Sequence, residues 1–157
     1  MATLDSIATV LHVLFGGLWI GSVAFVAIAV LPLGRDATID PESLSTVVDR
    51  LLVLSRFAAL VMLATGAHVL YHVTLGGELA TDPLLSSGRG HLVLTMVVLW
   101  LGVIATVEIG SSKLGDGLDA GKLREPTRTA LPWFRAAAFL GIAVLTIGGM
   151  LSAGVGF

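Results

Sequence analysis

The stretch LHVLFGGLWIGSVAFVAIAVLP, residues 11–32, contains no charged side chain. Together with the apolar residues around it, it forms a segment at about 4–33, and a helix needs about 20 such residues to cross a bilayer. Three further stretches have the same character, at about 53–75, 91–111 and 131–155. We therefore predict an all-α fold: one transmembrane domain, residues 1–157, built as an integral membrane four-helix bundle.

The overall composition agrees with a lipid environment. Apolar residues make up 55% of the 157 residues and charged residues only 13%, which is more apolar surface than a small soluble domain can bury. A net charge of −2 gives no reason to expect a nucleic-acid partner. The chain has no cysteine, so thiolate metal sites and thiol catalysis are excluded, and histidine and methionine remain as the obvious ligands for soft or borderline metals.

The basic residues predict an orientation in the cell membrane. They concentrate in the first and third loops and at their borders: Arg35, Arg50, Arg56, Lys113, Lys122, Arg124, Arg128 and Arg135. Cytoplasmic loops carry an excess of lysine and arginine, so we expect these two loops inside and both termini outside.

The segment before the second span has its own pattern. Asp40 followed by Pro41 is a typical helix start, and apolar residues then recur at helical spacing through residues 41–52. We expect an amphipathic cytoplasmic extension that runs into the second span. Pro132 is expected in the first turn of the fourth helix, where its missing N–H costs little.

With this orientation, all four histidines fall in the outer half of the expected bundle. His12 lies about two turns into the first span, His68 and His72 lie in the last turns of the second, and His91 begins the third. Imidazoles are costly inside a bilayer and often mark a site or pathway there. Met96 and Met150 lie in the same half, so the candidate metal ligands are His12, His68, His72, His91, Met96 and Met150.

One acidic residue lies inside a predicted span. Glu108 is expected near the inner end of the third helix, at the level of Arg56 and Arg135, where a salt bridge is the favoured role and a proton or ion relay the alternative. The sequence contains no GxSxG, Walker or HExxH motif. We therefore expect a transporter or a metal- or haem-binding membrane protein rather than an enzyme.

The first helix, with His12, a Trp19-x-Gly21 seven residues later and a long apolar run ending in Leu31-Pro32, resembles the opening helix of the CopD copper-resistance family. The segment LATGAHVLYH, residues 63–72, is similar to the family's Thr-Gly segment. The resemblance implies a copper-binding or copper-transporting membrane protein, and His12 is the residue that matches the family position. Relatives often carry a lysine near the position of Met96, so a role tied to that lysine is not expected here.

Haem-associated membrane proteins of the HemJ type share the four-helix plan, which leaves a b-type haem protein as an alternative. His12 and His68 are expected at similar depth, as bis-histidine ligation of haem b requires, and Gly16, Gly17 and Gly66 would leave room for the macrocycle. A third alternative is an accessory membrane subunit without a cofactor. Small-residue faces at Gly17 and Gly21, and around Gly141, make a homodimer conceivable in each case.

Overall fold

The computed structural model describes residues 2–75 and 82–154, and these residues form helices with no strand among them. The helical elements are α1 (Ala2–Phe25), η1 (Val26–Val30), α2 (Leu31–Arg35), α3 (Pro41–His68), η2 (Val69–Thr74), α4 (Asp82–Ser86), α5 (Gly88–Leu118) and α6 (Arg124–Ser152). The prediction of an all-α fold is confirmed for this part of the chain. The segments η1 and η2 are π-helical, with a wider turn than an α-helix.

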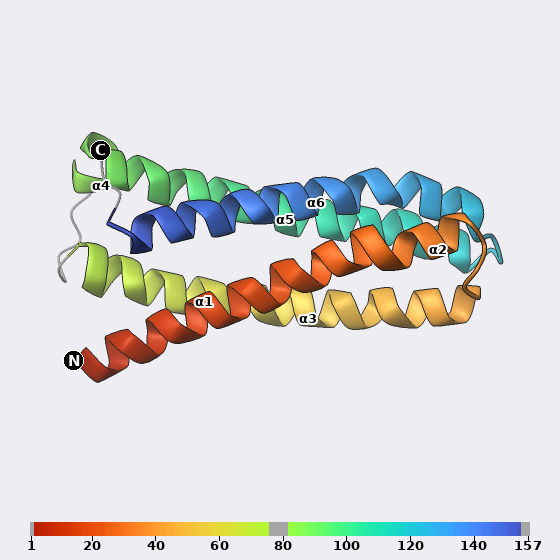
Figure 1. Cartoon of the computed structure of the whole chain (residues 1–157), viewed down its shortest axis with the longest axis horizontal. Helices are drawn as coiled ribbons and strands as arrows, with labels where there is room; N and C mark the ends of the chain where they lie inside the picture. The colour runs from red at the N-terminus through yellow and green to blue at the C-terminus, as the bar shows by residue number, and fades with distance from the viewer. Residues whose placement is uncertain (1, 76–81, 155–157) are drawn as a thin grey trace.

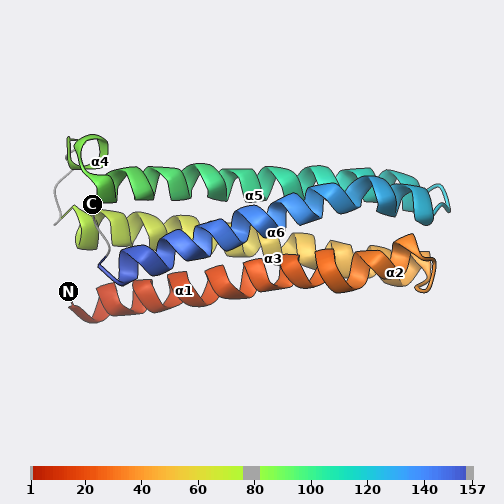
Figure 2. The ribbon, with the colours of Figure 1, turned by 45° about the horizontal axis from the view of Figure 1, so that its top comes forward.

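Four long helical runs lie side by side and alternate in direction (Figures 1 and 2). The first run, α1 to α2, packs against α3 and α6, and α5 packs against the same two helices. The beginning of α1, the end of η2, the beginning of α5 and the end of α6 share one end of the molecule, which we call the histidine end (Figure 1). The loops at 36–40 and 119–123 lie at the opposite end.

Within the described residues, three helices are long and apolar enough to cross a membrane: Thr3–Arg35, Gly88–Leu118 and Arg124–Ser152. They carry large apolar side chains on the surface, for example Ile28 at 70% and Phe139 at 73% exposed, as expected where lipid rather than water is the solvent. The chain thus has the features of a helical membrane protein. The expected second span, 53–75, corresponds to α3 and η2 and is not among these three helices.

The buried core lies mainly toward the opposite end. Its central members include Trp19, Leu44, Val103, Leu114 and Phe134, each 1% exposed or less. The core cluster has no member before Trp19 on α1, before Val103 on α5 or after Ala138 on α6. Among the described residues, the histidine end therefore contributes few side chains to this core.

Two details of the helix ends test local predictions. The N-cap role of Asp40 is confirmed, since its Oδ1 accepts a hydrogen bond of 2.8 Å from the N–H of Ser43. The prediction for Pro132 is wrong, because α6 already begins at Arg124 and Pro132 lies inside it. Pro132 is exposed, and because it has no N–H, the carbonyl of Arg128 in the preceding turn loses its usual helical hydrogen bond.

Candidate metal centre

His12 lines a pocket at the histidine half of the molecule with a volume of about 200 Å³. The pocket lies where α1, α3, η2, α5 and α6 meet, and its lining is mostly apolar. Besides His12 it is lined by Met62, Leu63, Gly66, Ala67, Leu70, Val93, Met96, Val97, Trp100 and Val144. One imidazole and two thioethers therefore border the same small apolar space.

A short chain of hydrogen bonds sets the protonation of His12. The Thr65 hydroxyl donates to the carbonyl of Val61 at 2.6 Å, so its only proton is already used. With the hydroxyl in this orientation, the 3.0 Å contact between Thr65 Oγ1 and His12 Nδ1 has the ring nitrogen as donor. This tautomer carries its proton on Nδ1 and leaves Nε2 of His12 with a lone pair for a metal.

Two glycines allow this arrangement. A Cβ atom at Gly66 would lie 3.0 Å from Cε1 of His12, so a larger residue there would press on the imidazole. A Cβ atom at Gly16 would lie 3.3 Å from Cε of Met62. The close approach of α1 and α3 at these glycines is what brings His12 and Met62 to one pocket.

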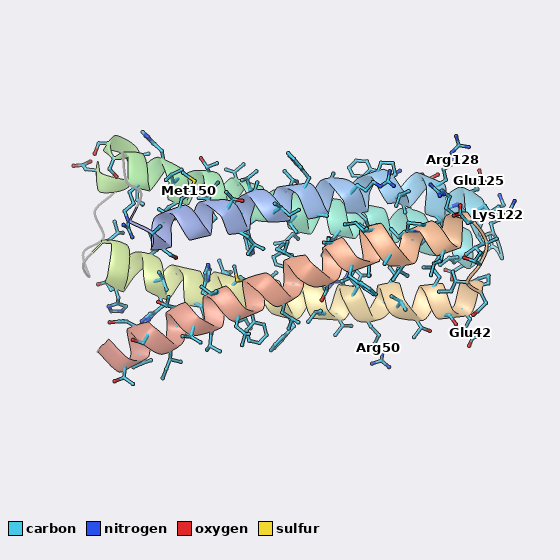
Figure 3. All side chains as sticks on the ribbon, viewed as in Figure 1. Glu42, Arg50, Lys122, Glu125, Arg128 and Met150 are labelled. Carbon is cyan, nitrogen blue, oxygen red and sulfur yellow. The ribbon has the colours of Figure 1, made fainter. Side chains whose placement is uncertain are left out.

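The two methionines named from the sequence differ in their position. Met96 lines the pocket, whereas Met150 does not and lies near the end of α6 (Figure 3). Met62, which is 7% exposed, was not among the predicted ligands because it lies nearer the middle of its helix. In the sequence, Gly16 is the residue that points to a role of Met62, because it leaves space for that side chain. This can be recognised only when α1 is known to pair with α3.

His68 and His72 form a second group near the surface. Nε2 of His68 lies 2.9 Å from Oδ1 of Asp5, an ion pair when the ring is protonated, and both side chains are about one third exposed. The His68 and His72 rings have centroids 4.5 Å apart, and Tyr71 meets His72 edge-on at 4.7 Å. Asp5 was not foreseen as a partner, because a contact between residues this far apart in sequence needs the helix pairing.

His91 lies apart from both groups. Its Nε2 hydrogen-bonds the carbonyl of Leu85 at 2.8 Å, and its ring is exposed at the start of α5. This contact ties the short helix α4 to α5. The imidazoles of His12, His68 and His91 thus contact three different partners.

Among residues 2–75 and 82–154, no group of three or more His, Cys, Asp or Glu side chains is placed to hold a metal ion. The pocket of His12 offers a different kind of donor set, because two of its three donors are methionine thioethers. The imidazole nitrogen of His12 and the sulfurs of Met62 and Met96 suit a soft monovalent ion such as Cu(I) and are poor ligands for hard divalent ions.

The space expected for a haem is partly filled by side chains. The volume beside Gly66 holds the His12 ring, and the volume beside Gly16 holds Met62. His68 does not line the pocket of His12. A pocket of about 200 Å³ is also below the roughly 300–1,000 Å³ usual for organic ligands.

The predicted salt bridge of Glu108 is present. Arg56 holds both carboxylate oxygens of Glu108 at 2.8 and 2.9 Å, linking α3 to α5. This bidentate geometry engages both oxygens of the carboxylate. The arrangement is that of a structural ion pair on the surface between two helices.

Comparison of the chain with protein-family models, with curated proteins and with solved structures found no match. The resemblance to the CopD family therefore remains a prediction from the residues that carry it.

Proposed function

We propose that this protein is a four-helix membrane protein that binds Cu(I) in the pocket of His12, as a copper carrier or as part of a copper pathway. In this proposal α3 and η2 form the fourth membrane crossing, and both termini face the outside of the cell membrane. His12 Nε2 and the thioethers of Met62 and Met96 are the ligands.

The observation that carries the proposal is the combination of these three donors in one apolar pocket. Cu(I) favours thioether and imidazole ligands in low coordination number, and an apolar surrounding disfavours the oxidised, more strongly hydrated ion. In the proposal Thr65 supports the site, because its oxygen accepts from Nδ1 of His12 and so leaves Nε2 free to bind the ion.

His68, His72 and Asp5 have a separate role in the proposal. They lie nearer the histidine end than Thr65, with Asp5 near the start of α1, His68 at the end of α3 and His72 in η2. We assign them to the first capture of the ion at the outer face, from which it passes to the deeper sulfur-containing site. His91, Met150 and the haem alternative have less support from the geometry.

The test is a Cu(I) competition titration with a colorimetric chelator on detergent-purified protein under reducing conditions. The unmodified protein should retain one Cu(I), and His12→Ala, Met62→Leu and Met96→Leu should each weaken binding by about ten-fold or more, since changes even beyond the direct ligands cost about 10–100-fold. Met150→Leu is the matched control. It also removes a thioether from the histidine half of the molecule, but Met150 does not line the pocket.

Two results would contradict the proposal. The first is an equal loss of affinity in Met150→Leu, which would mean that the binding is not located in this pocket. The second is a Soret band in the absorption spectrum of the purified protein that disappears in His12→Ala, which would make the site a haem site. Binding of neither group to folded protein would favour the cofactor-free alternative.

A further inference from the structure

A second and separate hollow lies on the surface between α1 and α3, in the half toward the opposite end. It is an open groove of about 470 Å³. Gly17 and Gly21 form its floor, and a Cβ atom at either position would have no neighbour within 4 Å. Phe25, Leu51 and Leu54 form its apolar walls.

The groove ends at a charged level of the molecule. On α3, α5 and α6 the charged residues Arg50, Arg56, Glu108 and Arg135 lie nearer the opposite end than a set of exposed apolar residues. This set is Phe57, Leu60 and Leu63 on α3, Leu94, Val97, Val98 and Leu101 on α5, and Phe139, Ile142 and Leu145 on α6, whereas Val53 lies between Arg50 and Arg56 and Ile109 follows Glu108. In a membrane this charged level would mark the boundary between the hydrocarbon and the headgroups.

The length of the groove fits one leaflet. From Gly17 to Val26 it spans ten residues of α1 and η1, or nine steps of ~1.5 Å, which is about 13 Å. Half of the ~30 Å hydrocarbon core is about 15 Å. The groove therefore runs from near the bilayer centre to the charged level.

Arg50 supplies a charge at the headgroup end of the groove. It is exposed and lines the groove, and Figure 3 shows it extending from α3 away from the other helices. Among the described residues no acidic group or other hydrogen-bond acceptor pairs with it. Arg56 and Arg35, by contrast, are paired with Glu108 and Asp36.

We propose that this groove binds an anionic phospholipid of the leaflet at the opposite end, with an acyl chain along Gly17 and Gly21 and the phosphate on Arg50. The inference rests on the proposed membrane insertion and is independent of copper. The guanidinium of Arg50 matches the phosphate of such a lipid, and the apolar groove beside it matches an acyl chain. Basic pockets between helices on the cytoplasmic side are typical lipid-headgroup sites.

A second copy of the chain is the rival occupant, because Gly17 and Gly21 form a GxxxG pair. Charge argues against it. A two-fold dimer places the same surface patch of both copies face to face, which would bring two unpaired Arg50 side chains together. An anionic lipid neutralises Arg50 and a symmetric partner does not.

The experiment is native mass spectrometry of the protein extracted from membranes that contain phosphatidylglycerol and phosphatidylethanolamine. The unmodified protein should carry one phosphatidylglycerol as a monomer. Gly21→Leu should abolish this adduct, because its Cβ has free space and the rest of its side chain occupies the groove. Arg50→Gln should reduce the preference for the anionic lipid about five-fold, the factor that ~1 kcal/mol per arginine at an anionic surface gives.

Two controls match these variants. Gly148→Leu adds the same side chain at another open helical position, and Arg135→Gln removes an exposed arginine at the same charged level outside the groove. Both should keep the adduct. An adduct lost equally in the controls, an adduct retained in Gly21→Leu, or a dimer that Gly21→Leu dissociates would each overturn the proposal.

Discussion

Thr65 contacts Nδ1 of His12, and this is the residue-scale feature on which the proposed copper site depends. When its hydroxyl donates to the carbonyl of Val61, its oxygen accepts from His12 Nδ1 and Nε2 keeps a lone pair. The identity of His12 as a candidate could be predicted from the sequence. The tautomer could not, because it depends on the contact between helices α1 and α3.

Replacing Thr65 tests this dependence without removing a ligand. Thr65→Val keeps the shape of the side chain but removes the acceptor for Nδ1–H, so we expect Cu(I) affinity to fall by about 10–100-fold, as for other second-shell partners of metal ligands. Thr65→Ser keeps the hydroxyl and should bind nearly as well as the unmodified protein. Equal affinities of the Val and Ser variants in the competition titration would argue against the role of Thr65.

At the scale of elements, the sequence predicted the helices well and their contacts poorly. Periodicity and apolar length gave the four long runs, and Asp40 gave the start of α3. The start of α6 was placed too late, because the polar residues from Arg124 to Thr129 were taken as loop although they continue the helix. The hydrophobic periodicity does not predict that the chain changes from an α-helix to the π-helical segment η2 after His68.

The close contact of α5 with α6 gives a stability prediction. A Cβ atom at Gly117 would overlap the ring of Pro126, whereas one at Gly115 would meet nothing within 4 Å. Gly117→Ala should lower the free energy of unfolding by about 1–3 kcal/mol through overpacking. Gly115→Ala, two residues away, should raise it by up to about 1 kcal/mol through helix propensity. Thermal unfolding in detergent measures the stability of both variants. Similar shifts in melting temperature for Gly117→Ala and Gly115→Ala would contradict the close contact of Gly117 with Pro126.

The N-cap of α3 gives a pH prediction. Hydrogen bonds from Ser43 hold the pKa of Asp40 below its usual range. A lowered folded-state pKa means that the stabilisation is complete above the unfolded pKa of about 3.9 and is lost as the pH falls through the folded value. Asp40→Ala should therefore lower the melting temperature most at neutral pH, and the difference from the unmodified protein should shrink in acid.

Asp40→Asn is the control for this effect. It keeps an oxygen that accepts from the Ser43 N–H but does not titrate. Its melting temperature should stay close to that of the unmodified protein at neutral pH. A loss in Asp40→Ala that is the same at neutral and acidic pH would show that the carboxylate charge does not contribute.

At the scale of the whole molecule, the two ends differ in chemistry. The histidines, Asp5 and the small pocket lie toward one end, and most arginines and lysines with the dense core lie toward the other. The sequence indicated this division through the loop charges. It did not indicate that the four histidines would separate into a pocket site, a surface group and the single His91, because that depends on the rotation of each helix about its axis.

The membrane topology can be tested with single cysteines, since the chain has none of its own. Ser86→Cys should react with a membrane-impermeant maleimide on intact cells, whereas Thr38→Cys and Lys122→Cys should react only after permeabilisation. Thr38 and Ser86 lie on the two sides of α3 and η2 in the chain. The same labelling pattern at both positions would mean that this segment does not cross the membrane.

The central claim is that Cu(I) binds between His12, Met62 and Met96, and X-ray absorption spectroscopy of the Cu(I)-loaded protein tests it most directly. The proposed site predicts a first shell of one nitrogen and two sulfur neighbours, with a smaller sulfur contribution in Met62→Leu or Met96→Leu and an unchanged spectrum in Met150→Leu. A first shell made only of nitrogen and oxygen would place the metal at the surface histidines and contradict the account.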